Sequence, residues 1–269
     1  MSHRKDNSQA LGDFTATPRI ILLSVMAIVI GLLSTVVAWA LLRLIGFFTN
    51  LFYYGHASVA FVSPAENHLG WLAIFVPVAG GLVIGLMARY GSERIRGHGI
   101  PEALESILIN GSKVQPRLAI LKPISAAISI GSGGPFGAEG PIIMTGGAFG
   151  SIIAQLFHLT AVERKTLLVA GAAAGMSATF AAPVAAVLLA VELLLFEWKP
   201  RSIVPVALAS AAAGAARRYM LGVGPLFPTP PHAIFMGPAG IAGCVISGLL
   251  AGGLACLLTL MVYAAEDAF

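Results

Sequence analysis

The chain alternates long apolar runs with short polar or glycine-rich breaks, a pattern typical of a polytopic membrane protein. Residues 20–49 form an apolar stretch that only Arg43 interrupts, and residues 70–90 form a second stretch long enough to cross a bilayer. A third stretch, residues 236–264, lies near the end of the sequence. We expect each to be a membrane-spanning helix, the first of them tilted and retained in the mature protein.

Shorter apolar segments fill the rest of the chain. We expect a loop on the far side at residues 52–69, and half-length helices embedded in protein at residues 103–110 and 117–130. Further helices are predicted at residues 142–157, 163–180, 184–198 and 202–219, with a break at Ala182-Pro183 and a Pro-rich loop at residues 224–231. The prediction is an all-α membrane bundle of roughly seven to nine tilted and broken helices.

Composition supports this class. Hydrophobic residues make up 57% of the chain, charged residues only 10%, and the mean hydropathy is +0.88, which excludes an ordinary soluble globule. The formal charge of +4 comes from Lys and Arg in the loops, which fits anionic lipid better than nucleic acid. Cys244 and Cys256 share one apolar segment without metal-ligand spacing, so we expect no metal and no cofactor.

The charged residues also predict the orientation. Residues 1–18 are polar and are expected to form a cytoplasmic tail, followed by a membrane domain over residues 19–269. A second group of basic residues marks the same face: Arg89, Arg94, Arg96, Lys113, Arg117 and Lys122. The expectation is a multi-pass protein of the cell membrane, the inner membrane of a bacterium, with its amino terminus in the cytoplasm.

The stretch Gly131-Ser-Gly-Gly-Pro-Phe-Gly-Ala-Glu-Gly-Pro141 places one carboxylate, Glu139, between two apolar segments. Its glycines allow close backbone approach, and its final proline suits the first turn of a helix. The amides of Ala138, Glu139 and Gly140 are then helix-start donors at the positive end of the helix dipole, which is a ready anion site. Because ionisable groups between membrane helices are functional by default, a packing turn with an interfacial glutamate is the less favoured alternative.

A second break, Gly97-His-Gly-Ile-Pro-Glu102, precedes the short segment at residues 103–110. Pro101 and Glu102 suit the first turn of a helix. From this motif alone, His98 is better interpreted as a loop histidine on the wet cytoplasmic side. The segment at residues 117–130 leads into the break at residues 131–141 and the helix that follows it. Two half-length segments that flank an ionisable break indicate a substrate site near the membrane midplane.

These two breaks carry a resemblance to a known family. Residues 97–102 resemble the GSGIPE motif of the CLC family of chloride channels and transporters, and residues 137–141 resemble its GxEGP motif. Residues 142–147 look like the continuation of the latter, and residues 171–183 are similar to the family's GAAAG and APxAG stretch. The resemblance covers about residues 20–264. It implies an inverted repeat of tilted helices, with an anion path in each subunit of a homodimer.

Carried over to these positions, the resemblance implies that Glu139 is the gating glutamate. The implied anion-binding groups are His98 in place of the family's serine, Gly99, Ile100, Ala138, Glu139 and Gly140. The implied function is transmembrane transport of chloride, with fluoride or nitrate as alternatives, and not enzymatic catalysis. A voltage- or pH-gated channel and a proton-coupled antiporter are both consistent with the resemblance.

Proton coupling and assembly depend on the helices that follow. Where proton-coupled members commonly carry a second glutamate, this chain has Leu193, which favours a channel, while Glu192 matches a different family glutamate. If the protein is proton-coupled, the candidates for its proton path are Glu139, Glu192 and Glu197. Glu197 is expected one helical turn beyond Leu193 on the same face, as an inner proton acceptor or an interfacial anchor. The small-residue helices at residues 184–198 and 202–219 correspond to the family's dimer interface.

Three departures from the family pattern affect these expectations. Ala138 stands where many members have a basic residue, which weakens the positive field near the gate. A histidine at position 98 can donate a hydrogen bond like a hydroxyl when neutral, but it also titrates near neutral pH. The family's third motif, GxFxP, and its pathway tyrosine are absent, so we expect a fragment or a natural half that needs a second repeat.

Two alternative functions belong to other classes of membrane protein. One is a membrane scaffold that transports nothing. The other is an intramembrane serine protease using Ser132, but its GxSG context is missing because Ile130 precedes Gly131. A phosphate-binding loop is weaker still, since the glycines follow no predicted strand and lack a P-loop lysine.

Overall fold

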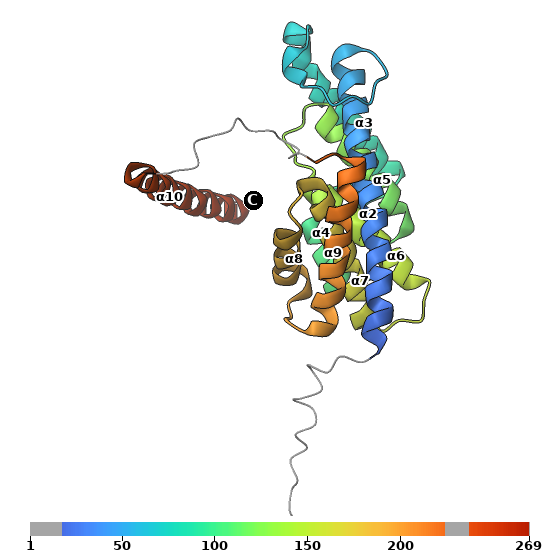
Figure 1. The fold of residues 1–269 in the computed structure, drawn as a ribbon. Coiled ribbons are helices and arrows are strands. Elements are labelled where there is room, and N and C mark those ends of the chain that lie inside the picture. Colours follow the sequence, from blue (N-terminus) through green and yellow to red (C-terminus); the bar gives the residue numbers. More distant parts are fainter. Residues whose placement is uncertain (1–17, 224–236, 269) are drawn as a thin grey trace, which may run out of the picture. The chain divides into compact units, whose positions relative to one another are not determined.

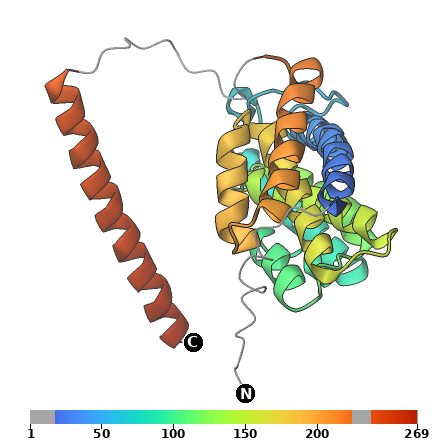
Figure 2. The same cartoon turned by 60° about the horizontal axis from the view of Figure 1, so that its bottom comes forward.

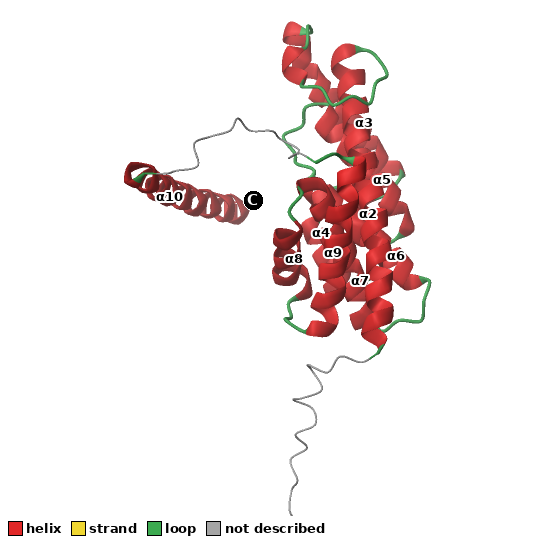
Figure 3. Cartoon of the chain, viewed as in Figure 1, coloured by secondary structure: helices red, strands yellow, loops and turns green. Residues whose placement is uncertain are grey.

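The computed structural model describes residues 18–223 and 237–268, and within these ranges the chain consists of helices joined by loops, without a strand (Figure 3). The predicted tail, apart from Pro18, and the predicted Pro-rich loop lie outside the described residues. The chain divides into two units, residues 1–226 and 227–269, and each is described by itself. The all-α fold predicted from the sequence is confirmed.

Three helical segments are long and apolar enough to cross a membrane. They are Arg19–Tyr54, which comprises α2 (Arg19–Thr49) and a π-helical turn (Asn50–Tyr54), Gly70–Tyr90, which ends in α3 (Phe75–Tyr90), and α10 (Pro238–Ala268). Each coincides with a predicted span. The predicted loop at residues 52–69 begins within the π-helical turn and otherwise holds one short 3-10 turn, Pro64–Glu66.

The remaining helices are mostly shorter. They are α4 (Ile100–Leu108), α5 (Pro116–Gly131), α6 (Glu139–Gln155), α7 (Ala161–Phe180), α8 (Pro183–Ala190) and α9 (Pro200–Met220). The predicted helix at residues 184–198 is wrong at its end. After α8 a π-helical turn covers Val191–Leu195, and Phe196 then adopts a left-handed φ of 55°, which terminates the helix.

α2, α7 and α9 lie side by side in the first unit, as two views show (Figures 1 and 2). Arg19 at the start of α2 forms an ion pair with Glu163 in the first turn of α7. Further along both helices, the Ser34 hydroxyl donates a hydrogen bond to the Gly171 carbonyl oxygen at 3.3 Å. Because the second contact lies closer to the carboxyl end on both helices, α2 and α7 run in the same direction.

α9 runs in this direction too. A Cβ on Gly31 of α2 would overlap the Ala209 carbonyl oxygen of α9, so the two backbones touch there. One turn later, the Thr35 hydroxyl donates to the Ala213 carbonyl oxygen at 3.4 Å. All three helices therefore start at one end of the bundle, and their last turns lie toward the opposite end.

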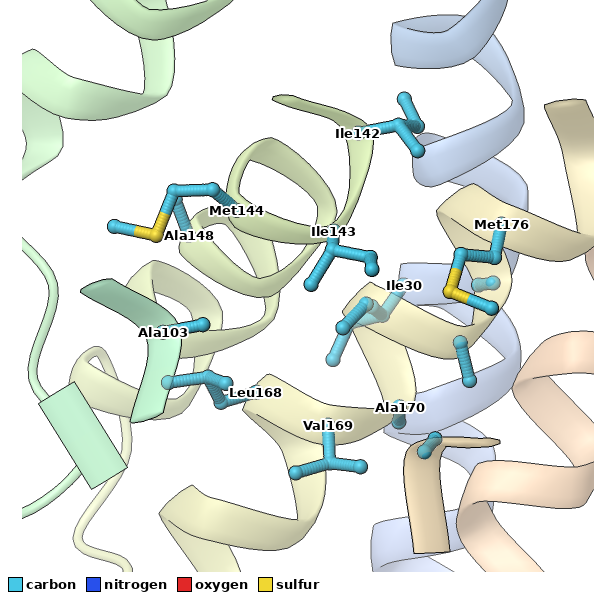
Figure 4. Packing of buried hydrophobic residues seen from close by; sticks show 14 of the residues in the cluster. Ile30, Ala103, Ile142, Ile143, Met144, Ala148, Leu168, Val169, Ala170 and Met176 are labelled. Carbon is cyan, nitrogen blue, oxygen red and sulfur yellow. The ribbon is translucent and has the colours of Figure 1, made fainter. Parts of the chain in front are cut away.

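α6 crosses α7 at glycines. A Cβ on Gly150 would overlap the Leu167 carbonyl oxygen, and a Cβ on Gly171 would overlap that of Gly146. Buried apolar side chains of both helices surround this crossing, among them Ile143 (Figure 4). Since lipid tails are as apolar as the protein core, such close packing is what holds membrane helices together. The packing of α6 against α7 holds α6 in place and thereby positions its amino-terminal end.

Candidate functional site

The start of α4 is built by two glycines and a glutamate. Gly97 and Gly99 have φ angles of 90° and 108°, which glycine adopts without strain. The Glu102 carboxylate, in the first turn, accepts a hydrogen bond from the Gly99 amide at 2.6 Å. The amide of Gly99, which the family resemblance assigns to the anion, is therefore bound by Glu102 in this structure. The amide of Ile100 belongs to the first turn, which has no acceptor one turn earlier in its own helix.

The start of α6 carries the glutamate singled out from the sequence. Ala138 is the N-cap residue, and its carbonyl oxygen accepts from the Ile142 amide at 3.0 Å. Pro141 lies in the first turn, as predicted, so the amides of Glu139 and Gly140 are the helix-start donors. The Glu139 side chain is half-buried, and in residues 18–223 and 237–268 its carboxylate forms no ion pair or hydrogen bond.

The two helix starts abut. A Cβ on Gly140 would overlap the His98 carbonyl oxygen and would lie 3.1 Å from the Nδ1 atom of its imidazole. A Cβ on Gly99 would overlap the Gly140 carbonyl oxygen. The structure thus brings together His98, Gly99 and Gly140, which are far apart in the sequence. The positive ends of both helix dipoles lie at this junction.

A cavity of about 590 Å³ adjoins the junction and lies between α3, α5 and the segments that precede α4 and α6. Its lining includes three basic side chains, Arg96, His98 and Lys122, and none of the described residues that line it is acidic. Serine side chains of α5 also line it, among them Ser125 and Ser129. A cavity with cations and hydroxyl groups favours an anion over a cation.

Lys122 is a site residue that the sequence reasoning missed. The sequence reasoning counted it only as one of the basic residues of the cytoplasmic face, whereas the structure shows that its side chain is buried, with 2% exposed. Its ammonium group donates to the carbonyl oxygens of Ile95 at 3.0 Å and Gly97 at 2.8 Å. The lysine therefore anchors the loop before α4. A lone lysine in the middle of an otherwise apolar segment was the signal that could have identified it.

The acidic residues of the predicted proton path are not arranged as expected. Glu192, in the π-helical turn after α8, is exposed. The prediction that Glu197 lies one helical turn beyond Leu193 on the same face is wrong, because the helix has ended before Phe196. Glu197 stands in the extended segment that leads to α9.

Glu197 takes part in a local ionic cluster. Its carboxylate accepts a hydrogen bond from the Ser202 hydroxyl at 2.6 Å and lies 3.9 Å from the Lys165 ammonium and 3.7 Å from the Arg201 guanidinium. Lys165 also donates to the Leu195 carbonyl oxygen at 3.0 Å. These contacts tie the start of α7 to the start of α9.

Ser132 has no protease-like surroundings. Its hydroxyl donates to the Ser129 carbonyl oxygen at 3.1 Å, and its own carbonyl oxygen accepts from the Tyr53 hydroxyl at 3.1 Å. Within the part of the chain that the structure describes, no histidine is hydrogen-bonded to Ser132. The arrangement lacks the nucleophile and base pair that serine catalysis needs.

Long apolar spans, short embedded helices and two abutting helix starts define an integral membrane protein of the class that builds ionic sites from broken helices. The chain belongs to the voltage gated chloride channel family, whose sequence model matches residues 80–269. The family resemblance noted in the sequence is thereby confirmed.

Several relatives share this similarity. The chain is 28% identical over 217 residues to the "Putative chloride channel protein ClcB-like" of Ralstonia nicotianae, covering 79% of this chain and 50% of that protein. It is 33% identical over 196 residues to the "H(+)/Cl(-) exchange transporter ClcA" of Salmonella paratyphi B, covering 70% of this chain and 39% of that protein. The chain thus spans about half the length, or less, of these relatives.

Solved structures agree on the fold. A CLC-type fluoride/proton antiporter superposes with a TM-score of 0.69 at 20% identity, covering 88% of this chain and 56% of that one. A slow cyanobacterial Cl-/H+ antiporter superposes with a TM-score of 0.62 at 23% identity, covering 78% and 49%. The predicted CLC-type arrangement of tilted and broken helices is confirmed.

Proposed function

We propose that the complete protein transports chloride or a related anion across the membrane through a pathway gated by Glu139. The meeting of the two helix starts carries this proposal. α4 and α6 direct the positive ends of their dipoles to the contact between His98 and Gly140, and an anion there would gain from both. His98, Ile100, Ala138, Glu139 and Gly140 would supply its contacts.

Glu139 would act as a competitor for the same position. An ionised carboxylate in the first turn of α6 is itself attracted to the helix-start amides. When it takes up a proton, this attraction falls and an anion can replace it. Lys122 and Arg96, which line the adjoining cavity, would raise the local concentration of anions. They partly compensate for the missing basic residue at Ala138.

Exchange of protons for anions is the mode we propose first, because a 33% identical relative is named an exchange transporter. Glu139 would carry the proton at the gate. Passive conduction is the second candidate. It is favoured by Leu193, which cannot relay a proton, and by the channel names of other relatives. In either mode Glu197 would serve as an anchor, since it is held by Lys165 and Arg201.

The orientation proposed is the one expected from the sequence, with the amino terminus in the cytoplasm of a bacterium. α2, α7 and α9 all start at one end of the bundle, and basic residues gather at these starts: Arg19, Arg164, Lys165, Lys199 and Arg201. Such residues mark the cytoplasmic side. Residues 19–269 would then form the first repeat and the beginning of a second, whose remaining helices would complete the pathway.

We propose a homodimer through the helices of residues 184–198 and 202–219, with fewer small residues of α9 in the contact than the sequence predicted. Ala209, Ser210 and Ala213 of α9 are buried against α2 and α7 within the chain. They are therefore not available to a partner. Ala211 and Ala215 are exposed on the same helix and are the small residues that a second subunit could approach.

The experiment imposes a chloride gradient on vesicles that hold the complete protein and records both chloride and pH. Exchange predicts sustained uphill proton movement that Glu139→Gln abolishes while chloride flux persists. Chloride flux without proton movement in the unmodified protein would support a channel. Chloride flux no greater than in empty vesicles would overturn the proposal in favour of a scaffold.

A further inference from the structure

We propose that Glu102 is a second carboxylate that competes with the transported anion, at the start of α4 as Glu139 does at the start of α6. This inference rests on the proposed function, because it concerns the same two helix starts. The Glu102 carboxylate accepts a hydrogen bond from the Gly99 amide at 2.6 Å. An anion can bind that amide only after the carboxylate has left it, so Glu102 lowers the affinity of the pathway for its anion.

The Gly99 amide lies where the two helix starts meet. Gly99 directly precedes Ile100, the first residue of α4, and a Cβ on it would overlap the Gly140 carbonyl oxygen of α6. The amide therefore stands at the positive end of the α4 dipole, where an anion is stabilised. In this structure the protein's own carboxylate fills that position.

Gly97 makes room for the carboxylate. Its φ angle is 90°, and a Cβ on this residue would overlap the Oε1 atom of Glu102. The carboxylate thus lies directly against the backbone of the loop and binds the Gly99 amide with its other oxygen, Oε2. Any side chain at position 97 would push the carboxylate away from this amide.

Lys122 is a charged partner for the carboxylate once an anion has displaced it. The Lys122 ammonium donates to the Gly97 carbonyl oxygen at 2.8 Å, so the ammonium and the Glu102 carboxylate both contact Gly97. The two opposite charges attract each other, and because Lys122 is buried, water screens the attraction little. A carboxylate that leaves Gly99 can therefore turn to Lys122 and remain paired.

The two carboxylates differ in how they are held. Among the described residues, no group forms a hydrogen bond or an ion pair with Glu139, whereas Glu102 is already bound to its amide. A hydrogen bond to an ionised group is about twice as strong as a neutral one, so an anion meets stronger competition at α4 than at α6. Glu139 then acts as the gate, and Glu102 sets how tightly the anion is held.

A purely structural cap is the competing role for Glu102. Glutamate at the third position of a helix often binds the amide of the preceding N-cap residue and stabilises the helix without any ligand. The two roles predict opposite changes in anion affinity. Loss of a structural cap loosens the start of α4 and weakens anion binding, whereas loss of a competitor strengthens it. The abutting start of α6 and the buried cation Lys122 favour a competitor, since both attract a mobile anion to this place.

Isothermal titration calorimetry of chloride binding to the complete protein in detergent tests the proposal. All proteins carry Glu139→Gln, so that the carboxylate at α6 does not contribute. We expect added Glu102→Gln to tighten chloride binding about fivefold, because glutamine replaces a charge-assisted hydrogen bond by a neutral one. Glu102→Asp keeps the charge but withdraws the carboxylate from Gly99, and should tighten binding less. Glu105→Gln is the matched control, since it removes the same charge from an exposed position of α4 and should leave the affinity unchanged.

Thermal unfolding shows which variants are folded, and Glu102→Asp, which keeps an acidic first turn, decides the question if Glu102→Gln is not. Unchanged or weaker chloride binding in folded Glu102 variants would assign the residue to the structural cap and overturn the proposal. Equal gains in Glu102→Gln and Glu105→Gln would show that only the overall charge matters, with the same consequence. Absence of chloride binding in every protein, including the one with Glu139→Gln alone, would instead overturn the proposed function itself.

Discussion

Replacing Lys122 by Met tests how the cavity beside the helix starts is held together. The lysine is 2% exposed and donates to the carbonyl oxygens of Ile95 and Gly97. Met keeps the length of the side chain but makes neither hydrogen bond. Each bond to a charged group contributes about 1.5–3 kcal/mol, so losing both costs roughly 3–6 kcal/mol if nothing replaces them. Met avoids the cost of burying a charge, and water in the cavity can reach the freed carbonyl oxygens. We therefore expect Lys122→Met to lower the free energy of unfolding by about 2–3 kcal/mol.

The assay is equilibrium unfolding of the complete protein in mixed micelles, followed by tryptophan fluorescence. Lys113→Met is the matched control, because Lys113 is exposed and the substitution removes the same charge. The apparent affinity for chloride should also fall in Lys122→Met, since the loop that holds His98 loses its anchor. If Lys122→Met unfolds with the same free energy as Lys113→Met, the two hydrogen bonds do not hold the loop.

Three other substitutions test the packing and the ionic groups around the site. Gly140→Ala should lower the free energy of unfolding by about 1–3 kcal/mol, because its Cβ meets the His98 carbonyl oxygen, whereas Gly85→Ala on α3, with open space around it, should not. Ala211→Trp should shift cross-linked dimer to monomer in detergent, and an unchanged dimer fraction would place the interface elsewhere. Glu197→Gln should lower the melting temperature and leave proton movement in vesicles intact, and loss of proton movement at unchanged stability would contradict the anchor role.

Much of the fold could be predicted because membranes constrain helices strongly. A run as long as residues 20–49 has one stable arrangement in a bilayer, a helix, and a glycine-rich break between short apolar segments must be embedded in protein. Pro141 marked the start of α6 correctly, since proline fits the first helical turn.

The details that the sequence did not reveal depend on tertiary contacts. Counting charges treats every lysine alike, so it could not distinguish the buried Lys122 from the exposed Lys113. Helical periodicity carried Glu197 past the end of α8, because nothing in the pattern showed that Phe196 would turn left-handed. The sequence also did not indicate that Glu102 would bind the amide of Gly99, which the family resemblance assigns to the anion.

The central claim is that Glu139 competes with an anion for the helix-start amides of α6. The direct measurement is chloride flux from vesicles holding the complete protein as external pH is varied, for the unmodified protein and for Glu139→Gln. Glutamine keeps the shape of the side chain but carries no charge to compete and no proton to release. We predict that flux in the unmodified protein depends on external pH and that flux in Glu139→Gln does not. A Glu139→Gln protein that keeps the unmodified pH dependence would contradict the account.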